Sequence, residues 1–79
     1  MTPPRWVRDA HPDQYLAGRA AAWRQQRTRA ARSLEECERE CTANLFGAPK
    51  LAAWWAGYAV WLGEQLAAGV EVPHREPSR

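Results

Sequence analysis

The stretch that decides the fold is PKLAAWWAGYAVWLGEQLAA, residues 49–68, in which residues 51–63 carry no charge. Pro49 suits the first turn of a helix and Gly69 suits a C-terminal cap. The apolar residues recur at helical spacing on two stripes: Leu51, Trp55, Tyr58, Leu62 and Leu66 on one, and Trp54 and Trp61 on the other. A helix that is apolar almost all round is normally buried on several sides. The pattern therefore predicts a helix over about 49–68 that several surfaces must cover.

A second apolar pattern precedes this stretch and is typical of a long helix. It advances from residue 16 to residue 45 in eight steps of three or four residues, which is about 3.6 per turn. Its apolar members, with Arg27 filling one turn, are Leu16, Ala20, Trp23, Ala30, Leu34, Cys37, Cys41 and Leu45. The unbroken phase favours one helix over about 12–44. A local alternative is a kink near 32–33, because Ser33-Leu34-Glu35-Glu36 matches a capping box that starts a new helix.

These two patterns predict an all-α chain that forms a single domain over residues 1–79. We expect an extended N-terminal arm (1–11), an antiparallel helical hairpin (12–69) and a flexible tail (70–79). Two helices cannot enclose the apolar surface of the second helix. The sequence therefore predicts self-association, for example as a dimer, or docking on a partner.

The length and composition exclude several classes of protein. A chain of 79 residues allows one domain, and five tryptophans are many for a core of that size. No run of about 20 apolar residues predicts a membrane span, and no secretory signal is recognisable, so we expect a cytoplasmic protein. Two cysteines are too few for a disulfide scaffold.

Charge is distributed unevenly along the chain. Residues 1–32 hold seven arginines and two aspartates, a net charge of +5, whereas residues 33–79 hold four basic and seven acidic residues, a net charge of −3. Arginine suits phosphate, and Arg5-Trp6-Val7-Arg8 mixes basic and stacking residues as single-stranded RNA binders do. The alternatives are a solvated basic face and a Trp6 that only anchors the N-terminus. The candidate RNA-binding residues are Arg5, Trp6, Arg8, Arg19, Arg24 and Arg27.

The sequence offers little for catalysis or metal binding. Cys37 and Cys41 are four residues apart and share a helix face, but only His11 and His74 could complete a zinc site. Buried reduced thiols are the favoured interpretation. Ser33 has no histidine close to it in the sequence, and no phosphate-binding loop is present. We therefore expect no enzyme activity, no metal and no cofactor.

Three local patterns resemble the ribosome modulation factor family of small bacterial proteins. They are Tyr15–Ala21 (YLAGRAA), Asn44–Phe46 (NLF) and Ala53–Tyr58 (AWWAGY), which is the most specific of the three. Members of that family are helical, bind ribosomal RNA and silence ribosomes in starved cells. The resemblance implies the same fold and a role in translation regulation. Gly18 and Gly57 would let two helices approach closely.

Two functional hypotheses follow. The first is a non-catalytic protein that associates with the ribosome or its RNA. The second is a protein–protein interaction module, such as a phage or accessory inhibitor of a host complex, that uses a Trp-rich helix face. The residues expected to bind a partner or to pack the helices are Tyr15, Gly18, Trp23, Trp54, Trp55, Gly57, Tyr58 and Trp61.

Overall fold

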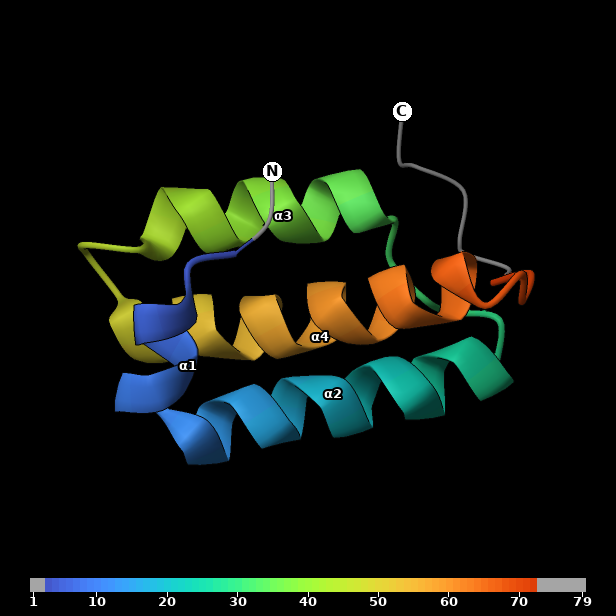
Figure 1. Ribbon diagram of the computed structural model, residues 1–79, viewed down its shortest axis with the longest axis horizontal. Coiled ribbons are helices and arrows are strands. Elements are labelled where there is room, and N and C mark those ends of the chain that lie inside the picture. Colours follow the sequence, from blue (N-terminus) through green and yellow to red (C-terminus); the bar gives the residue numbers. More distant parts are fainter. Residues whose placement is uncertain (1–2, 73–79) are drawn as a thin grey trace.

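A computed structural model describes residues 3–72, and within them the chain forms four helices (Figure 1). They are α1 (Arg5–Ala10), α2 (Pro12–Arg27), α3 (Leu34–Asn44) and α4 (Pro49–Ala67). The predicted all-α class and the predicted helix from residue 49 are confirmed. In this described part, none of the helices combines the length and the apolar character needed to cross a membrane.

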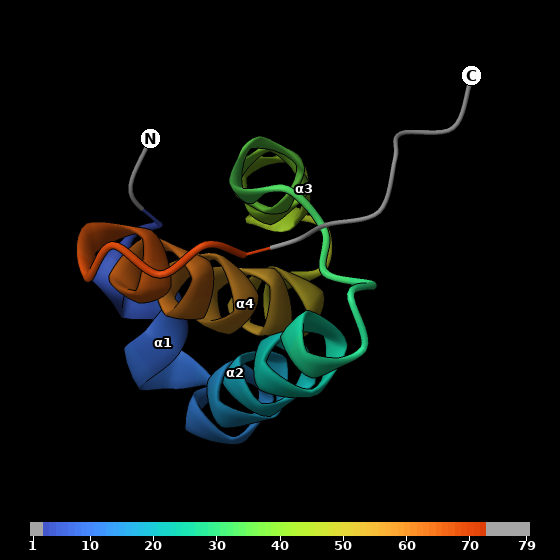
Figure 2. The ribbon, with the colours of Figure 1, turned by 90° about the vertical axis from the view of Figure 1, so that its right-hand side faces the viewer.

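Helix α4 lies between α2 and α3, with α1 against its side (Figure 2). Its buried residues include Ala52, Ala56, Tyr58 and Leu62. The prediction that this helix is buried on several sides is therefore confirmed, but helices of the same chain provide the cover. The number of helices available to cover α4 was underestimated, because three helices, not one, pack on it within the described residues.

The arrangement differs from a simple hairpin. Helices α2 and α4 run in the same direction and α3 runs opposite to both (Figures 1 and 2). Among residues 3–72, α2 and α3 do not pack against each other. In the described part of the chain, α3 and α4 are the one packed antiparallel pair, so the expected hairpin over residues 12–69 holds for its second half alone.

The prediction of one continuous helix over 12–44 was wrong, because the chain leaves the helix after Arg27. Arg29 adopts a left-handed conformation with φ of 60°. Its N–H donates to the carbonyl of Gln26 at 3.2 Å, and the N–H of Ala30 donates to that of Gln25 at 2.8 Å. These two bonds form a Schellman motif, which satisfies the last carbonyls of α2 and ends it.

A tyrosine of α4 stabilises the break between α2 and α3, residues 28–33. The hydroxyl of Tyr58 accepts a hydrogen bond from the backbone N–H of Arg32 at 2.9 Å and donates one to Oε1 of Gln25 at 2.6 Å. Ser33 then begins α3, since its hydroxyl accepts from the N–H of Glu36 at 3.2 Å. The capping box was the correct signal. Tyr58 supplies the partner that the Arg32 N–H would have within a continuous helix.

The break also changes which face of α2 is buried. The apolar residues at the start of the predicted seam face outward: Leu16 is 60% exposed and Trp23 is 46% exposed. The buried face carries Tyr15 and three small residues instead, namely Gly18, Ala21 and Ala22. The second half of the seam is buried as expected at Cys37 and Cys41. The buried face of α2 carries small side chains because the helix lies very close to α4.

That close approach occurs at the two glycines expected to allow it. A methyl group at Gly18 would overlap the carbonyl group of Trp54, and one at Gly57 would overlap the carbonyl group of Tyr15. The two backbones are therefore in direct contact where α2 crosses α4.

Both ends of the chain depart from expectation where the structure describes them. The arm predicted to be extended over 1–11 contains α1, whose Val7 is fully buried. Helix α1 ends at Ala10 because Pro12 disfavours helical backbone at the residue before it, His11. At the other end, Gly69 caps α4 with φ of 79°, as predicted. Val72 packs on the core, and residues 73–79 of the predicted tail, like residues 1–2, lie outside the described part.

Candidate nucleic-acid interface

The fold places opposite charges on opposite sides of α4. Helices α1 and α2 carry five arginines and two aspartates, whereas α3 carries four glutamates and one arginine. Since α4 lies between α2 and α3, the basic and acidic helices are separated by the width of the core (Figure 2). The uneven charge of the sequence thus becomes a basic side and an acidic side of the molecule.

The first group of candidate RNA-binding residues lies on α1. Arg5, Trp6 and Arg8 are all exposed. The guanidinium of Arg8 lies over the ring of Tyr15, 5.3 Å from its centroid. Trp6 stacks on Phe46 with centroids 6.5 Å apart, while 46% of Trp6 and 90% of Phe46 remain exposed. Trp6 therefore contacts the connection between α3 and α4 and still presents part of its ring to solvent.

The second group lies on the outer face of α2, where Trp23, Arg24 and Arg27 are all exposed. They line a shallow hollow together with Thr28. The guanidinium of Arg27 lies over the indole of Trp23 at 4.8 Å from the centroid. We expected Trp23 to bind a partner or to pack between helices, and it does not pack between helices. The spacing of four residues between Trp23 and Arg27 was the signal that could have indicated this exposed pair.

Arg19 has a different environment from the other candidate arginines. It is partly buried and forms a salt bridge with Glu64 of α4 at 2.7 Å. Its guanidinium also lies 5.6 Å from the centroid of the Trp61 ring. Because a carboxylate already balances its charge, Arg19 joins α2 to α4 and is less suited to a phosphate than Arg24 or Arg27.

Most of the residues expected to bind a partner or pack helices are packed within the chain. Trp54 and Trp55 meet edge to face at 5.0 Å between centroids, and Trp54 lies 5.4 Å from Tyr58. Trp54 and Trp61 are partly exposed but pack on the core. The buried members of the set are Tyr15, Gly18, Trp55, Gly57 and Tyr58. The aromatic face of α4 is therefore mostly internal, and Trp23 is the exposed exception.

Sequence reasoning missed the polar residues that hold this aromatic cluster. Besides the Gln25 bond to Tyr58, Oε1 of Gln26 accepts from the indole N–H of Trp61 at 3.0 Å. The guanidinium of Arg32 lies 5.2 Å from the centroid of the Trp55 ring and pairs with Glu36 at 3.3 Å. No local motif marks Gln25 or Gln26, because each bonds to a side chain more than 30 positions away. The spacing of four residues between Arg32 and Glu36 was a local signal for their ion pair.

The two cysteines are free, buried thiols. Burial, with a contribution from the nearby Glu36 carboxylate, raises the pKa of Cys37 to about 12. Burial and Glu38 raise the pKa of Cys41 in the same way. Both thiols are therefore protonated at neutral pH and are poor nucleophiles. Within residues 3–72, no group of three or more His, Cys, Asp or Glu side chains could hold a metal ion.

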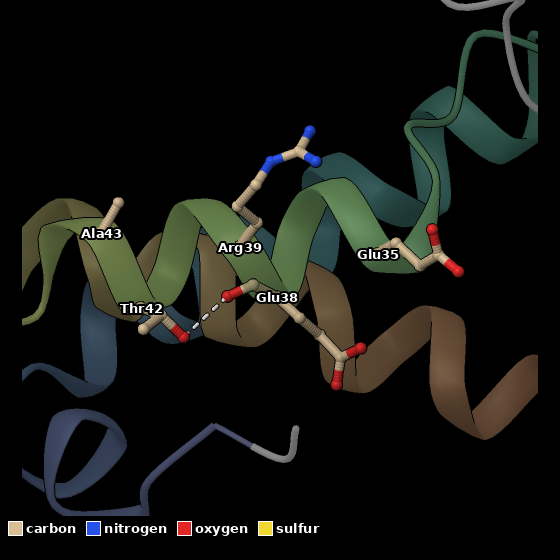
Figure 3. Close-up of a pocket in the computed structure, with 5 residues that line it drawn as sticks. All are labelled: Glu35, Glu38, Arg39, Thr42 and Ala43. Carbon is tan, nitrogen blue, oxygen red and sulfur yellow. Dashed lines mark hydrogen bonds between the residues drawn. The ribbon is translucent and has the colours of Figure 1, made fainter.

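A further hollow lies on the outer surface of α3 and is lined by Glu35, Glu38, Arg39, Thr42 and Ala43 (Figure 3). The Thr42 hydroxyl donates to the backbone carbonyl of Glu38 at 3.0 Å. The side chains of Arg39 and Glu38 extend to opposite sides of the helix (Figure 3). The lining residues come from one helix and do not converge on a point, which does not resemble a catalytic site.

Comparison of the chain with protein-family models, with curated proteins and with solved structures finds no match in any of the three. The best-formed candidate for binding is thus the set of exposed basic and aromatic residues on α1 and α2, and α4 separates α2 from the acidic α3.

Proposed function

We propose that the protein is a small, non-catalytic RNA-binding protein of the bacterial cytoplasm that associates with the ribosome and regulates translation. One observation carries the proposal. Exposed arginines and exposed tryptophans lie together on α1 and on α2, while the glutamates of α3 lie on the other side of the molecule. The resemblance to ribosome modulation factor points to ribosomal RNA as the ligand.

The separation of basic and acidic helices determines which side of the protein RNA approaches. Guanidinium groups bind phosphate through two parallel hydrogen bonds, and each contact releases a counterion from the nucleic acid. The acidic α3 repels phosphate, so RNA approaches the α1 and α2 side. If Arg5, Arg8, Arg24 and Arg27 each contact one phosphate, log Kd should rise with log salt with a slope of about 3.

Binding of purified ribosomes and ribosomal RNA at about 50 mM salt tests the proposal. The double variants Arg5→Gln/Arg8→Gln and Arg24→Gln/Arg27→Gln should each bind more weakly, by about tenfold for each arginine removed. Arg39→Gln is the control, because it removes one positive charge from the acidic side and should leave binding unchanged, whereas each double variant removes two from the basic side. An equal effect in the control and in the double variants, or no binding by the unaltered protein, would contradict the proposal.

A second candidate function is docking on a host protein complex, and one observation favours it. Phe46 and Trp6 stack on each other at one end of the molecule and remain exposed. Paired exposed aromatic residues are common at the centres of protein interfaces. This surface replaces the Trp54, Trp55 and Trp61 face as the docking candidate, since that face packs internally.

Capture of partners from host lysate, with and without nuclease, separates the two candidates. Recovery of ribosomal proteins that nuclease abolishes supports RNA binding. One dominant partner that resists nuclease and no longer binds Phe46→Ala supports protein docking. Sedimentation of the pure protein tests the separate proposal of a homo-oligomer: a single species at the monomer mass at micromolar concentration would refute it.

A further inference from the structure

The large apolar side chain of Trp23 is exposed on the surface of the folded chain. It lies on the face of α2 opposite to the buried Gly18, Ala21 and Ala22, and 46% of it is exposed. Leu16, seven positions earlier and on the same face, is exposed and apolar as well, so α2 presents apolar residues where an unpartnered helix normally carries polar ones. Packing within the chain does not explain this exposure.

We propose that Trp23, Arg24 and Arg27 form a site for an unpaired nucleotide of RNA. The base stacks on the face of the Trp23 indole that the guanidinium of Arg27 does not cover, and the guanidinium groups of Arg24 and Arg27 bind neighbouring phosphates. This inference rests on the proposed RNA-binding function and names the part of the RNA that the site recognises.

The arrangement of cations around the ring supports an anionic ligand. The guanidinium of Arg27 lies 4.8 Å from the centroid of Trp23, and Arg24 lines the same hollow. Among the described residues, no salt bridge joins Arg24 or Arg27 to a carboxylate. The one acidic residue of α2, Asp13, is 10 positions before Trp23, about 15 Å along the helix. Both positive charges are therefore available to phosphate.

The flat ring of Trp23 favours recognition of an unpaired base rather than of a duplex. An exposed indole offers a stacking platform, and a base can reach it only when it has left its own stack. Duplex recognition would instead require contacts to backbone and groove, for which a tryptophan ring gives no advantage. The combination of one aromatic ring with two flanking arginines matches the chemistry of single-stranded binding.

The test measures fluorescence anisotropy of a labelled single-stranded oligouridine of about eight nucleotides and of a labelled RNA duplex at about 50 mM salt. Trp23→Ala should weaken single-strand binding by about tenfold or more, whereas Trp23→Phe retains a ring and should have a smaller effect. Leu16→Ala is the matched control, because it removes exposed apolar surface from the same face of α2. Circular dichroism checks that each variant remains helical.

Weaker binding that is specific to Trp23→Ala and to the single strand supports the site. Unchanged single-strand binding in Trp23→Ala, with weaker binding in Arg24→Gln/Arg27→Gln, overturns the stacking site and leaves the RNA-binding function standing. An equal decrease for single strand and duplex also overturns it. If Trp23→Ala abolishes binding to intact ribosomes but not to oligouridine, Trp23 contacts a protein and the inference fails. Absence of RNA binding by the unaltered protein refutes both proposals.

Discussion

Two glycines of α4, Gly57 and Gly63, should respond in opposite ways to the same substitution. A methyl group at Gly57 would overlap the carbonyl group of Tyr15 and lie 3.1 Å from the backbone nitrogen of Arg19. A methyl group at Gly63 meets nothing within 4 Å. Both residues lie inside the helix, so alanine gains the same intrinsic helix propensity at each, about 1 kcal/mol.

The difference in unfolding free energy between Gly57→Ala and Gly63→Ala therefore measures the effect of the contact between α2 and α4. Gly63→Ala should stabilise the protein by about 0.5–1 kcal/mol. At Gly57 the obstacle is backbone and cannot rotate away, so overpacking should cost about 3 kcal/mol or more and outweigh the propensity gain by about 2 kcal/mol. For a domain of this size, these values correspond to a Tm about 2–8 °C higher for Gly63→Ala and about 8–16 °C lower for Gly57→Ala.

Thermal and urea unfolding, followed by circular dichroism, measure both changes. Gly18→Ala should behave like Gly57→Ala, because its methyl group would overlap the Trp54 carbonyl. If Gly57→Ala stabilised the protein as much as Gly63→Ala, α2 could not cross α4 at this point and the description of the core would be wrong.

Three further predictions concern the break and the buried hydroxyl and thiol groups. Tyr58→Phe should lower the unfolding free energy by about 1–3 kcal/mol in urea titrations, because the Arg32 N–H and the Gln25 side chain lose their shared partner; an unchanged midpoint would argue against the break. Arg29→Gly should stabilise by about 1 kcal/mol in the same assay, since glycine adopts the φ of 60° without strain; destabilisation would contradict the left-handed cap. Burial raises the pKa of Cys37 to about 12, so the stability that the protonated thiol contributes is complete below its unfolded pKa of about 9 and is lost as the pH rises toward 12. In Cys37→Ala the urea midpoint should therefore fall less steeply with pH between about 9 and 12. An equally steep fall in the variant would refute the burial of Cys37.

The helix from residue 49 was predictable because a long charge-free segment with proline before it and glycine after it leaves few alternatives. The boundary between α2 and α3 was not predicted as the favoured alternative, although the capping box at Ser33 indicated it correctly. The apolar phase runs through the break without interruption, so periodicity alone cannot detect it. The deciding contact is Tyr58, which is 26 residues away from Arg32 in sequence.

The buried face of α2 was predicted incorrectly for a related reason. Hydrophobicity favoured Leu16 and Trp23, but contact with the α4 backbone requires small residues such as Gly18 and Ala22. The resemblance had drawn attention to Gly18 and Gly57 for close packing, and that expectation is confirmed. The spacing of four residues between Trp23 and Arg27 is compatible with an exposed pair, but the apolar pattern placed Trp23 on the same face as the residues expected to be packed.

Salt dependence of ribosome binding is the most direct test of the central claim that the arginines on α1 and α2 bind RNA. Raising salt from about 50 to about 200 mM should weaken binding by about 60-fold if four phosphates are contacted. Arg24→Gln/Arg27→Gln should reduce the slope to about half, and Arg39→Gln should leave it unchanged. Binding that is absent at low salt, or that does not vary with salt, would contradict the claim.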